Sequence, residues 1–281
     1  MRCIDEAVAV GAETLSKAGI EAPRREARLL LAHVLGADLG HLLGHGEESI
    51  GAAEWSGYLG RLERRAQREP LSRIVGYREF WGLPFQLGPQ TLDPRPDSET
   101  LVEAVLQRFP ERNRPLRILD LGTGSGCLLI SLLAERPCAE GLGIDRSFAA
   151  VAVAAGNAAR LGVGARSLFS VGNWLDALAG RFDAVVANPP YVRTKELSGL
   201  APEVSAYEPK LALDGGKDGL DCYRAIVSGL LPALADGGLV FLEFGEGQAD
   251  ALEVLLRHVG FSRFERLTDL AGRERCLVAG P

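Results

Sequence analysis

The sequence predicts an α/β protein with a mostly parallel sheet of seven strands, preceded by a small helical domain and a linking β-hairpin. From residue 116 onward, short apolar runs alternate with helical segments, and this alternation implies βαβ crossovers and a sheet covered on both faces. The chain has 281 residues and is 47% hydrophobic, which is enough to bury a full core. We therefore expect a helical domain over residues 1–70, a hairpin linker over 71–90 and the sheet domain over 91–281.

The first part of the chain has helical periodicity. Pro23 stands where a helix can begin, and apolar residues recur at helical spacing up to Gly36. The other faces of a second amphipathic stretch are rich in arginine, including Arg65, which indicates a solvated surface; a partner-binding surface is the alternative. The apolar face of this stretch carries Trp55, Leu59, Leu62 and Ala66.

Two histidines in this part are spaced as metal ligands on a helix face would be. His41 and His45 are four residues apart. However, Gly40, Gly44 and Gly46 surround them, and glycine disfavours a helix interior by about 1 kcal/mol relative to alanine. We therefore expect both histidines in a loop, and we predict no metal site in the chain.

Further elements follow in order along the chain. Aromatic and aliphatic residues between 74 and 87 are punctuated by glycine and proline, which predicts a short hairpin. Asp97 or Ser98 is expected to cap the next helix. Residues 261–267 and 276–279 predict a terminal antiparallel hairpin. Five apolar runs predict the remaining strands, at residues 117–120, 141–145, 167–171, 182–187 and 239–244.

The loop after the first of these strands is rich in glycine. It has the sequence Asp120-Leu121-Gly122-Thr123-Gly124-Ser125-Gly126, so the backbone can turn sharply and a ligand can approach the following helix closely. Nineteen residues past Gly126, Asp145 ends the next strand, where an acid can accept both hydroxyls of a ribose. These features predict a nucleoside site on a Rossmann-like sheet. The alternative is that the glycines only ease the packing of strand against helix.

The glycine spacing favours S-adenosylmethionine over a dinucleotide. A dinucleotide-binding loop has the pattern G-x-G-x-x-G and faces a pyrophosphate, whereas this loop has G-x-G-x-G after an acidic residue. The methionine part of S-adenosylmethionine carries no phosphate and tolerates Asp120. Asn173 and Trp174, after the third strand, are expected at the adenine, and the alternative for Trp174 is a core position. The other expected cofactor contacts are Gly122, Thr123, Gly124, Ser125, Gly126 and Asp145.

The tetrapeptide Asn188-Pro189-Pro190-Tyr191 follows the apolar run at 182–187. A buried strand therefore delivers it to the edge of the sheet where open α/β proteins place their chemistry. Asparagine has an acceptor oxygen, and the prolines leave carbonyls free to accept. The tetrapeptide can hold a planar –NH2 group between two acceptors while Tyr191 covers its face. The alternative is a strand that ends in a proline turn.

The composition narrows the class of protein. A net charge of −6 argues against a basic nucleic-acid module. The first residues are charged too early for a signal peptide, and no apolar stretch approaches the length of a bilayer span. Five scattered cysteines without C-x-x-C spacing argue against a disulfide framework and a zinc site. We expect a cytoplasmic protein with reduced thiols.

With these motifs in this order, the chain resembles the HemK-type N5-glutamine methyltransferases that modify peptide chain release factors. The resemblance covers most of residues 70 to 280. The family usually has an aliphatic residue at Asp93, Glu-Thr at Asp97-Ser98 and Asp at Asn173, and the chain departs from it there. Segments that carry the resemblance outside the site motifs include Pro70-Leu71-Ser72-Arg73-Ile74-Val75-Gly76, Phe80-Trp81-Gly82-Leu83-Pro84-Phe85 and Ala212-Leu213-Asp214-Gly215-Gly216.

The resemblance implies a class I S-adenosylmethionine-dependent methyltransferase fold. It implies transfer of a methyl group from S-adenosylmethionine, leaving S-adenosylhomocysteine, to the N5 nitrogen of the glutamine in the Gly-Gly-Gln motif of class I release factors. Asn188, Pro190 and Tyr191 would then be catalytic, Pro189 would join them in binding the substrate amide, and Asn188 would also lie at the cofactor. The helical domain would dock the release factor. We expect neither a membrane nor nucleic acid as a direct partner.

Other functions stay open. A ribosomal-protein glutamine methyltransferase would differ mainly in its docking domain. An adenine-N6 DNA methyltransferase also needs acceptors around a planar –NH2, although base flipping requires a basic duplex-binding surface. The intact tetrapeptide argues against a non-catalytic S-adenosylmethionine-binding module, and the glycine spacing argues against a dehydrogenase.

Overall fold

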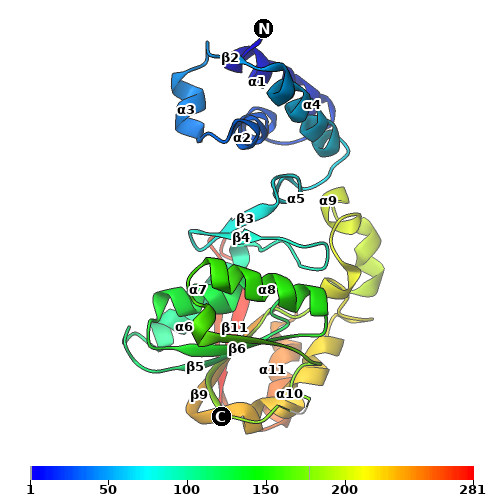
Figure 1. The fold of residues 1–281 in the computed structure, drawn as a ribbon. Coiled ribbons are helices and arrows are strands. Elements are labelled where there is room, and N and C mark those ends of the chain that lie inside the picture. The colour runs from blue at the N-terminus through cyan, green and yellow to red at the C-terminus, as the bar shows by residue number, and fades with distance from the viewer. Residues whose placement is uncertain (1, 177) are drawn as a thin grey trace. The chain divides into compact units, whose positions relative to one another are not determined.

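The chain forms two compact units (Figure 1). The structure is a computed structural model that describes residues 2–176 and 178–281. The first unit contains the residues up to Tyr77 together with Ala201–Tyr207. The second unit contains Arg78–Leu200 and Glu208–Pro281.

The first unit is helical. Its second helix has Pro23 in the first turn and ends at Gly36, whose left-handed backbone (φ 61°) closes the helix as the sequence predicts. Apolar side chains such as Val8, Leu30 and Leu62 form its core. The helices are α1 (Ile4–Lys17), α2 (Pro23–Leu35), α3 (Leu39–Gly44), α4 (Ala52–Ala66), α5 (Leu71–Val75) and α9 (Pro202–Ser205), and the short strands β1 (Arg2–Cys3) and β2 (Ser49–Ile50) pair antiparallel.

The prediction that His41 lies in a loop is wrong, because His41 lies in α3. Asp38 precedes this helix and accepts a 2.7 Å hydrogen bond from the backbone N–H of His41. A side-chain cap of this kind contributes about 1 kcal/mol, which offsets the low helix propensity of one glycine. His45 follows as the C-cap, and the two imidazole rings stack with centroids 4.3 Å apart.

We predicted that the polar side of α4 is solvated, and for Arg65 this prediction is wrong. Arg65 is 6% exposed, whereas Leu59, which we assigned to the apolar face, is 41% exposed. Arg65 donates from Nε to Glu26 Oε2 at 2.5 Å and from Nη1 to Glu203 Oε1 at 3.1 Å. A buried guanidinium is tolerated here because two carboxylates neutralise it.

The segment Ala201–Tyr207 belongs to the helical unit although its flanking residues belong to the second unit. Glu203 accepts from Arg65 and from Arg68, whose Nε lies 2.8 Å from Oε1. Tyr207 Oη donates to the Gln67 carbonyl at 3.0 Å. The predicted sheet domain is therefore interrupted: a segment that follows the Asn188 tetrapeptide is anchored on the helical unit.

A hairpin follows the helical unit, as the sequence predicts. The start of the predicted linker forms helix α5 instead, and Gly76 ends this helix with a left-handed backbone (φ 84°). Phe80 and Phe85 on the hairpin are buried against the core of the sheet unit, with ring centroids 6.2 Å apart. The hairpin strands are β3 (Tyr77–Phe80) and β4 (Leu83–Gln86).

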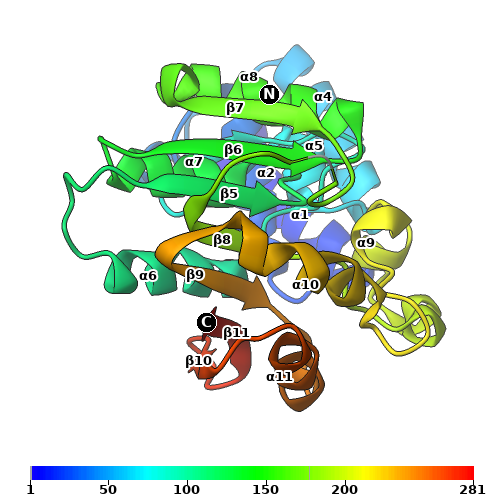
Figure 2. The same ribbon diagram turned by 90° about the horizontal axis from the view of Figure 1, so that it is seen from below.

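The second unit contains a seven-stranded sheet, which confirms the predicted fold class. The strand order is β10-β11-β9-β8-β5-β6-β7 (Figure 2). β11 is antiparallel to both neighbours, and the other six strands share one direction. The strands are β5 (Arg117–Leu121), β6 (Glu140–Asp145), β7 (Ser167–Val171), β8 (Phe182–Ala187), β9 (Leu234–Glu243), β10 (Arg263–Thr268) and β11 (Glu274–Gly280).

Helices cover both faces of this sheet. Ile118 and Val186 join one core cluster with α6, α7 and α8, whereas their neighbours Leu119 and Val185 join the other cluster with α10 and α11. The continuous apolar runs thus fill two cores, because successive strand residues face opposite sides. None of the described helices is long and apolar enough to cross a membrane. The helices are α6 (Glu99–Arg108), α7 (Cys127–Glu135), α8 (Phe148–Arg160), α10 (Asp221–Ala233) and α11 (Ala249–His258), and the 3₁₀ turns are η1 (Pro96–Ser98), η2 (Gly164–Arg166), η3 (Thr194–Gly199) and η4 (Lys210–Ala212).

Candidate active site

The candidate site lies where the strand order reverses. β5 has β6 on one side and β8 on the other, so the connections diverge and leave a crevice at the carboxyl ends of these strands. The glycine loop follows β5, Asp145 ends β6, and Asn188 follows β8. A cavity of about 290 Å³ occupies this position, and all three segments line it.

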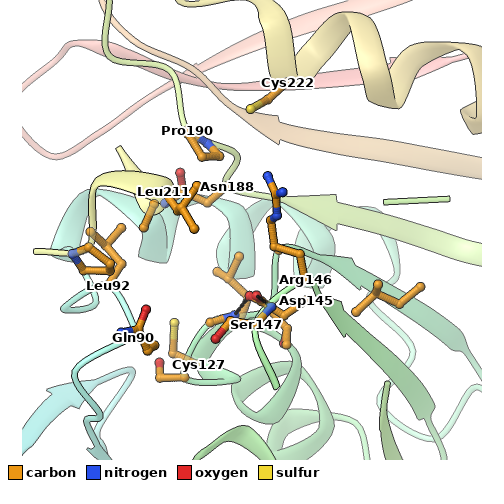
Figure 3. Close-up of a pocket in the computed structure, with 18 of the residues that line it drawn as sticks. Gln90, Leu92, Cys127, Asp145, Arg146, Ser147, Asn188, Pro190, Leu211 and Cys222 are labelled. Carbon is orange, nitrogen blue, oxygen red and sulfur yellow. Dashed lines mark hydrogen bonds between the residues drawn. The ribbon is translucent and has the colours of Figure 1, made fainter. Parts of the chain in front are cut away.

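Most of the predicted site residues surround this cavity. In Figure 3, Asp145 and Ser147 lie on one side of the cavity and Asn188 and Pro190 on the other. The lining includes Gly122, Thr123, Gly124, Ser125, Asp145, Asn173, Trp174, Asn188 and Pro190. Gly126, Pro189 and Tyr191, also predicted as site residues, are not part of the lining.

The backbone ties the glycine loop to β6. The N–H groups of Gly122 and Thr123 both donate to the Ile144 carbonyl, at 2.8 and 2.9 Å. The N–H of Gly124 donates to Asp145 Oδ2 at 3.0 Å. The loop and the end of β6 therefore form one rigid edge of the cavity.

Gly126 packs a helix instead of lining the cavity. It precedes α7 with a left-handed backbone (φ 81°), and a Cβ added there would lie 2.8 Å from Ile130 Cδ1 and 3.1 Å from Ala154 Cβ. A side chain would therefore separate α7 from α8. For this glycine, close helix packing explains the residue better than the predicted cofactor contact.

Asp145 has capacity left for a ligand. Its Oδ2 accepts from Gly124, and its Oδ1 accepts from the backbone N–H of Ser147 at 2.8 Å. A carboxylate offers about four lone-pair positions, so about two remain for further donors. Two vicinal hydroxyl groups of a ribose match this capacity, and the two backbone bonds fix the carboxylate in place.

Asp120 places a buried carboxyl group at the start of the glycine loop. It is fully buried, its Oδ2 accepts from Thr123 Oγ1 at 2.7 Å, and its Oδ1 has no hydrogen-bond partner among the described groups. Burial raises the pKa of this carboxyl to about 7, although the bond from Thr123 opposes the shift. A carboxyl beneath the loop opposes a phosphate and suits a cation. The carboxyl group of Asp120 therefore fits the cationic methionine part of S-adenosylmethionine better than it fits a pyrophosphate.

Trp174 has two environments. It lines the cavity and also packs against the core under α10 and α11. Its backbone is left-handed (φ 52°), and a Cβ on Gly122 would lie 3.3 Å from its ring. Asn173 donates from Nδ2 to Asp176 Oδ2 at 2.8 Å, so its Oδ1 is the side-chain atom that is left to accept. An acceptor at this place suits the amino group of an adenine.

The tetrapeptide presents Asn188 to the cavity. Asn188 Nδ2 donates to Ser98 Oγ at 2.9 Å, which leaves its Oδ1 as the free acceptor. Contrary to our prediction, Tyr191 does not line the cavity. Its hydroxyl donates to the buried Glu243 at 3.2 Å. The Tyr191 carbonyl accepts from Gln248 Nε2 at 2.9 Å, so this carbonyl is already occupied.

Ser98 does not cap α6 with its side chain. It occupies the N-cap position, yet its hydroxyl makes no capping bond. The hydroxyl instead meets the amide of Asn188. The residue predicted as a helix cap is thus part of the site.

The segment behind the tetrapeptide packs against it backbone to backbone. Val192 N–H donates to the Leu213 carbonyl at 3.0 Å, and Gly215 N–H donates to the Val192 carbonyl at 2.8 Å. A Cβ on Gly215 would lie 2.8 Å from both the Pro190 carbonyl oxygen and Tyr191 Cα. Gly215 therefore sets how closely the segment around it approaches the tetrapeptide backbone.

Gly215→Ala is expected to lower kcat for the methyl transfer that the resemblance implies by about tenfold. The added methyl group displaces the tetrapeptide, and a misplacement of about 1 Å costs on the order of a hundredfold in rate. Cofactor affinity is expected to stay within about twofold, because Gly215 does not line the cavity. Steady-state kinetics and calorimetry measure the two quantities. Gly156→Ala is the matched control, since nothing lies within 4 Å of a Cβ there; equal kcat for the two variants would contradict the prediction.

The cysteines at the cavity are not nucleophiles. Cys127 and Cys222 line it. Burial raises the pKa of the Cys127 thiol to about 12 and that of the Cys222 thiol to about 11. Both are therefore neutral near pH 7, and neither offers the thiolate that covalent catalysis requires.

Several lining residues were not predicted from the sequence. Arg146 and Ser147 could have been found, because they follow Asp145 directly. Leu92 and Arg95 precede η1, and Leu211 lies in η4; these segments carry no local pattern that marks a binding site. Leu211 is 64% exposed although it borders the cavity.

Comparisons with known proteins show which family the chain belongs to. The PrmC N-terminal domain family matches residues 6–76, and the methyltransferase small domain family matches residues 96–204. A release factor glutamine methyltransferase from Rhodospirillum rubrum is 49% identical over 269 residues, which cover 96% of this chain and 82% of that protein. The chain belongs to the release factor glutamine methyltransferase family.

A second relative and a solved structure extend this result. The release factor glutamine methyltransferase from Cereibacter sphaeroides is 43% identical over 280 residues and is covered to 98%. The hMettl16 catalytic domain has a TM-score of 0.57 at 16% identity, over 78% of this chain and 81% of that one. The latter shows the shared methyltransferase fold alone. Membership of the release factor glutamine methyltransferase family confirms the resemblance that the sequence motifs indicated.

Proposed function

We propose that this chain transfers a methyl group from S-adenosylmethionine to the N5 amide nitrogen of the glutamine in the Gly-Gly-Gln motif of class I release factors. The observation that carries the proposal is the amide of Asn188: Ser98 holds its nitrogen, and its oxygen is left to accept at the cavity. Membership of the release factor glutamine methyltransferase family supports the choice of substrate.

The loop side of the cavity would hold the methyl donor. Asp145 would accept the ribose hydroxyls, Trp174 and Asn173 would contact the adenine, and the loop above Asp120 would hold the methionine part. When bound, S-adenosylmethionine supplies a methyl group that its sulfonium already activates. The residues of the chain therefore need to orient the acceptor more than to activate the donor.

The tetrapeptide side would hold the acceptor amide. An amide nitrogen is a poor nucleophile, because its lone pair is delocalised into the carbonyl. Asn188 Oδ1 would accept one amide hydrogen, and the carbonyl of Pro190, or the neighbouring carbonyl of Pro189, would accept the other. The Tyr191 carbonyl already accepts a hydrogen bond from Gln248. Positioning of this kind lowers the activation free energy by roughly 7 to 11 kcal/mol at best.

The helical unit would dock the release factor. The match to the PrmC N-terminal domain family supports this assignment. The docking unit also contains Ala201–Tyr207, which lies 10 residues past Tyr191 in the chain. We place the reaction in the cytoplasm, where release factors act.

Mass spectrometry of a release factor incubated with the chain and S-adenosylmethionine tests the proposal. One added methyl group on the glutamine of Gly-Gly-Gln is expected, and a release factor with that glutamine replaced by asparagine should gain none. A methyl group on a ribosomal protein or on DNA instead would overturn the choice of substrate. Binding of S-adenosylmethionine without transfer to any of these would indicate a non-catalytic module, and calorimetry with NAD in parallel tests the dinucleotide alternative.

A further inference from the structure

A buried polar cluster lies behind the acceptor tetrapeptide. Glu243, the last residue of β9, is 1% exposed, and Ser98, at the start of α6, is 3% exposed. Glu243 belongs to none of the site motifs in the sequence. A buried carboxyl group is costly unless hydrogen bonds compensate it, so its partners indicate why it is there.

Glu243 contacts the tetrapeptide through Tyr191. Its Oε1 accepts from Tyr191 Oη at 3.2 Å, and its Oε2 is buried and makes no hydrogen bond to a described group. The Ser98 hydroxyl interacts with the same carboxylate and favours its charged form. Ser98 Oγ in turn accepts from Asn188 Nδ2 at 2.9 Å. Glu243 thus interacts with Ser98, and Ser98 with Asn188, which lines the cavity.

The protonation state of Glu243 decides the direction of the hydrogen bonds that Ser98 makes. A serine hydroxyl has one proton to donate. While Glu243 is ionised, the Ser98 hydroxyl directs its hydrogen towards the carboxylate, so Ser98 Oγ is left to accept from the Asn188 amide nitrogen. When Glu243 is protonated, it can donate to Ser98, which then donates to Asn188 and favours the flipped amide, with Oδ1 turned to Ser98. The flipped amide would turn its NH2 group towards the NH2 group of the substrate. Both groups are donors, so no hydrogen bond could form between them.

We propose that Ser98 and ionised Glu243 are positioning residues that fix the amide of Asn188 with its oxygen towards the substrate. This inference rests on the proposed function, because it gives Asn188 Oδ1 the role of accepting a substrate hydrogen. Neither residue donates or removes a proton in the methyl transfer itself. Their effect reaches the reaction only through the orientation of Asn188.

The surroundings of Glu243 support a titration close to neutral pH. Burial raises its pKa to about 7, while the bonds from Ser98 and Tyr191 and the charge of Arg275 oppose the shift and Asp97 adds to it. Arg275 is itself shared with Asp97 and Asp269, each at 3.4 Å. The ionisable groups that face Glu243 come from five elements, namely Asp97 on η1, Cys127 on α7, Tyr191 after β8, Tyr223 on α10, and Arg275 and Cys276 on β11.

Substitution of Ser98 in the full-length chain tests the inference. Ser98→Ala removes the acceptor for Asn188 Nδ2, and kcat with a release factor is expected to fall by about tenfold or more. The Kd of S-adenosylmethionine, measured by calorimetry, is expected to stay within about twofold. Ser98→Thr keeps the hydroxyl and is expected to restore most of kcat. The matched control is Ser131→Ala, which removes a fully buried hydroxyl on α7, outside the cavity, and should leave kcat unchanged.

The pH profile provides the second readout. In the unmodified chain, kcat is expected to fall below about pH 7 as Glu243 is protonated, and Glu243→Gln is expected to abolish this decline. Equal kcat for Ser98→Ala and Ser131→Ala, or an unchanged acid decline in Glu243→Gln, would overturn the inference. These outcomes differ from failure of the proposed function, in which the unmodified chain itself would not methylate the glutamine.

Discussion

Asn188→Ala is expected to remove most methyl transfer to the release factor while cofactor binding persists. The substitution deletes the side-chain oxygen that would accept a hydrogen from the substrate amide. In the unmodified chain Ser98 Oγ accepts a hydrogen bond from Asn188 Nδ2, and the substitution also removes this donor. Because the reaction depends on alignment of a poor nucleophile, kcat should fall on the order of a hundredfold or more.

Three measurements define this result. Single-turnover transfer of a labelled methyl group gives the rate, calorimetry gives the Kd of S-adenosylmethionine, and thermal unfolding reports the integrity of the fold. Asn113→Ala, at an exposed asparagine away from the cavity, is the matched control and should behave as the unmodified chain. Near-normal methylation by Asn188→Ala would remove Asn188 from the mechanism.

The sheet could be predicted from the sequence because its signals are local. The run at 182–187 is apolar at almost every position, and the structure uses both faces: Val185 and Val186 enter different cores. Turn residues such as Gly36 also fix backbone geometry within a few residues. Helix α3 was missed because the glycines argued against a helix and the cap from Asp38, which offsets the cost of one of them, was not considered.

Burial of charge could not be predicted in the same way. Arg65 has the local pattern of a solvated residue, but its partner Glu203 lies 138 residues away in the sequence. Only the placement of Ala201–Tyr207 on the helical unit makes this pairing possible. No periodicity within α4 contains that information.

The same distinction applies to the site. Asp145 and Asn188 were predicted because Asp145 ends a strand and Asn188 follows one, and the carboxyl ends of both strands reach the crevice. The contact of Ser98 with Asn188 spans 90 residues, so the sequence suggested only a helix cap. Tyr191 was assigned to the cavity wall from its position in the motif. Its ring turns to Glu243 instead, because that buried carboxyl group accepts its hydroxyl.

Asp145→Asn is expected to weaken binding of S-adenosylmethionine and to spare the methyl-transfer step. The carboxylate of Asp145 accepts backbone N–H groups of Gly124 and Ser147 with one oxygen each. An asparagine keeps only one acceptor oxygen, so its NH2 group must face one of these donors. Only the lost ribose contact weakens cofactor binding, because the bond to the backbone N–H is lost in the free and in the bound protein alike.

The expected size of this effect follows from hydrogen bonds to a charged group. Each contributes about 1.5 to 3 kcal/mol, so the Kd of S-adenosylmethionine should rise tenfold to about a hundredfold. At saturating S-adenosylmethionine, kcat should stay within a few fold, because Asn188 and its support are unchanged. Asp236→Asn, at a fully exposed side chain, is the matched control. If Asp145→Asn instead lowers kcat at saturation and leaves the Kd unaltered, Asp145 orients the reacting groups and does not hold the ribose.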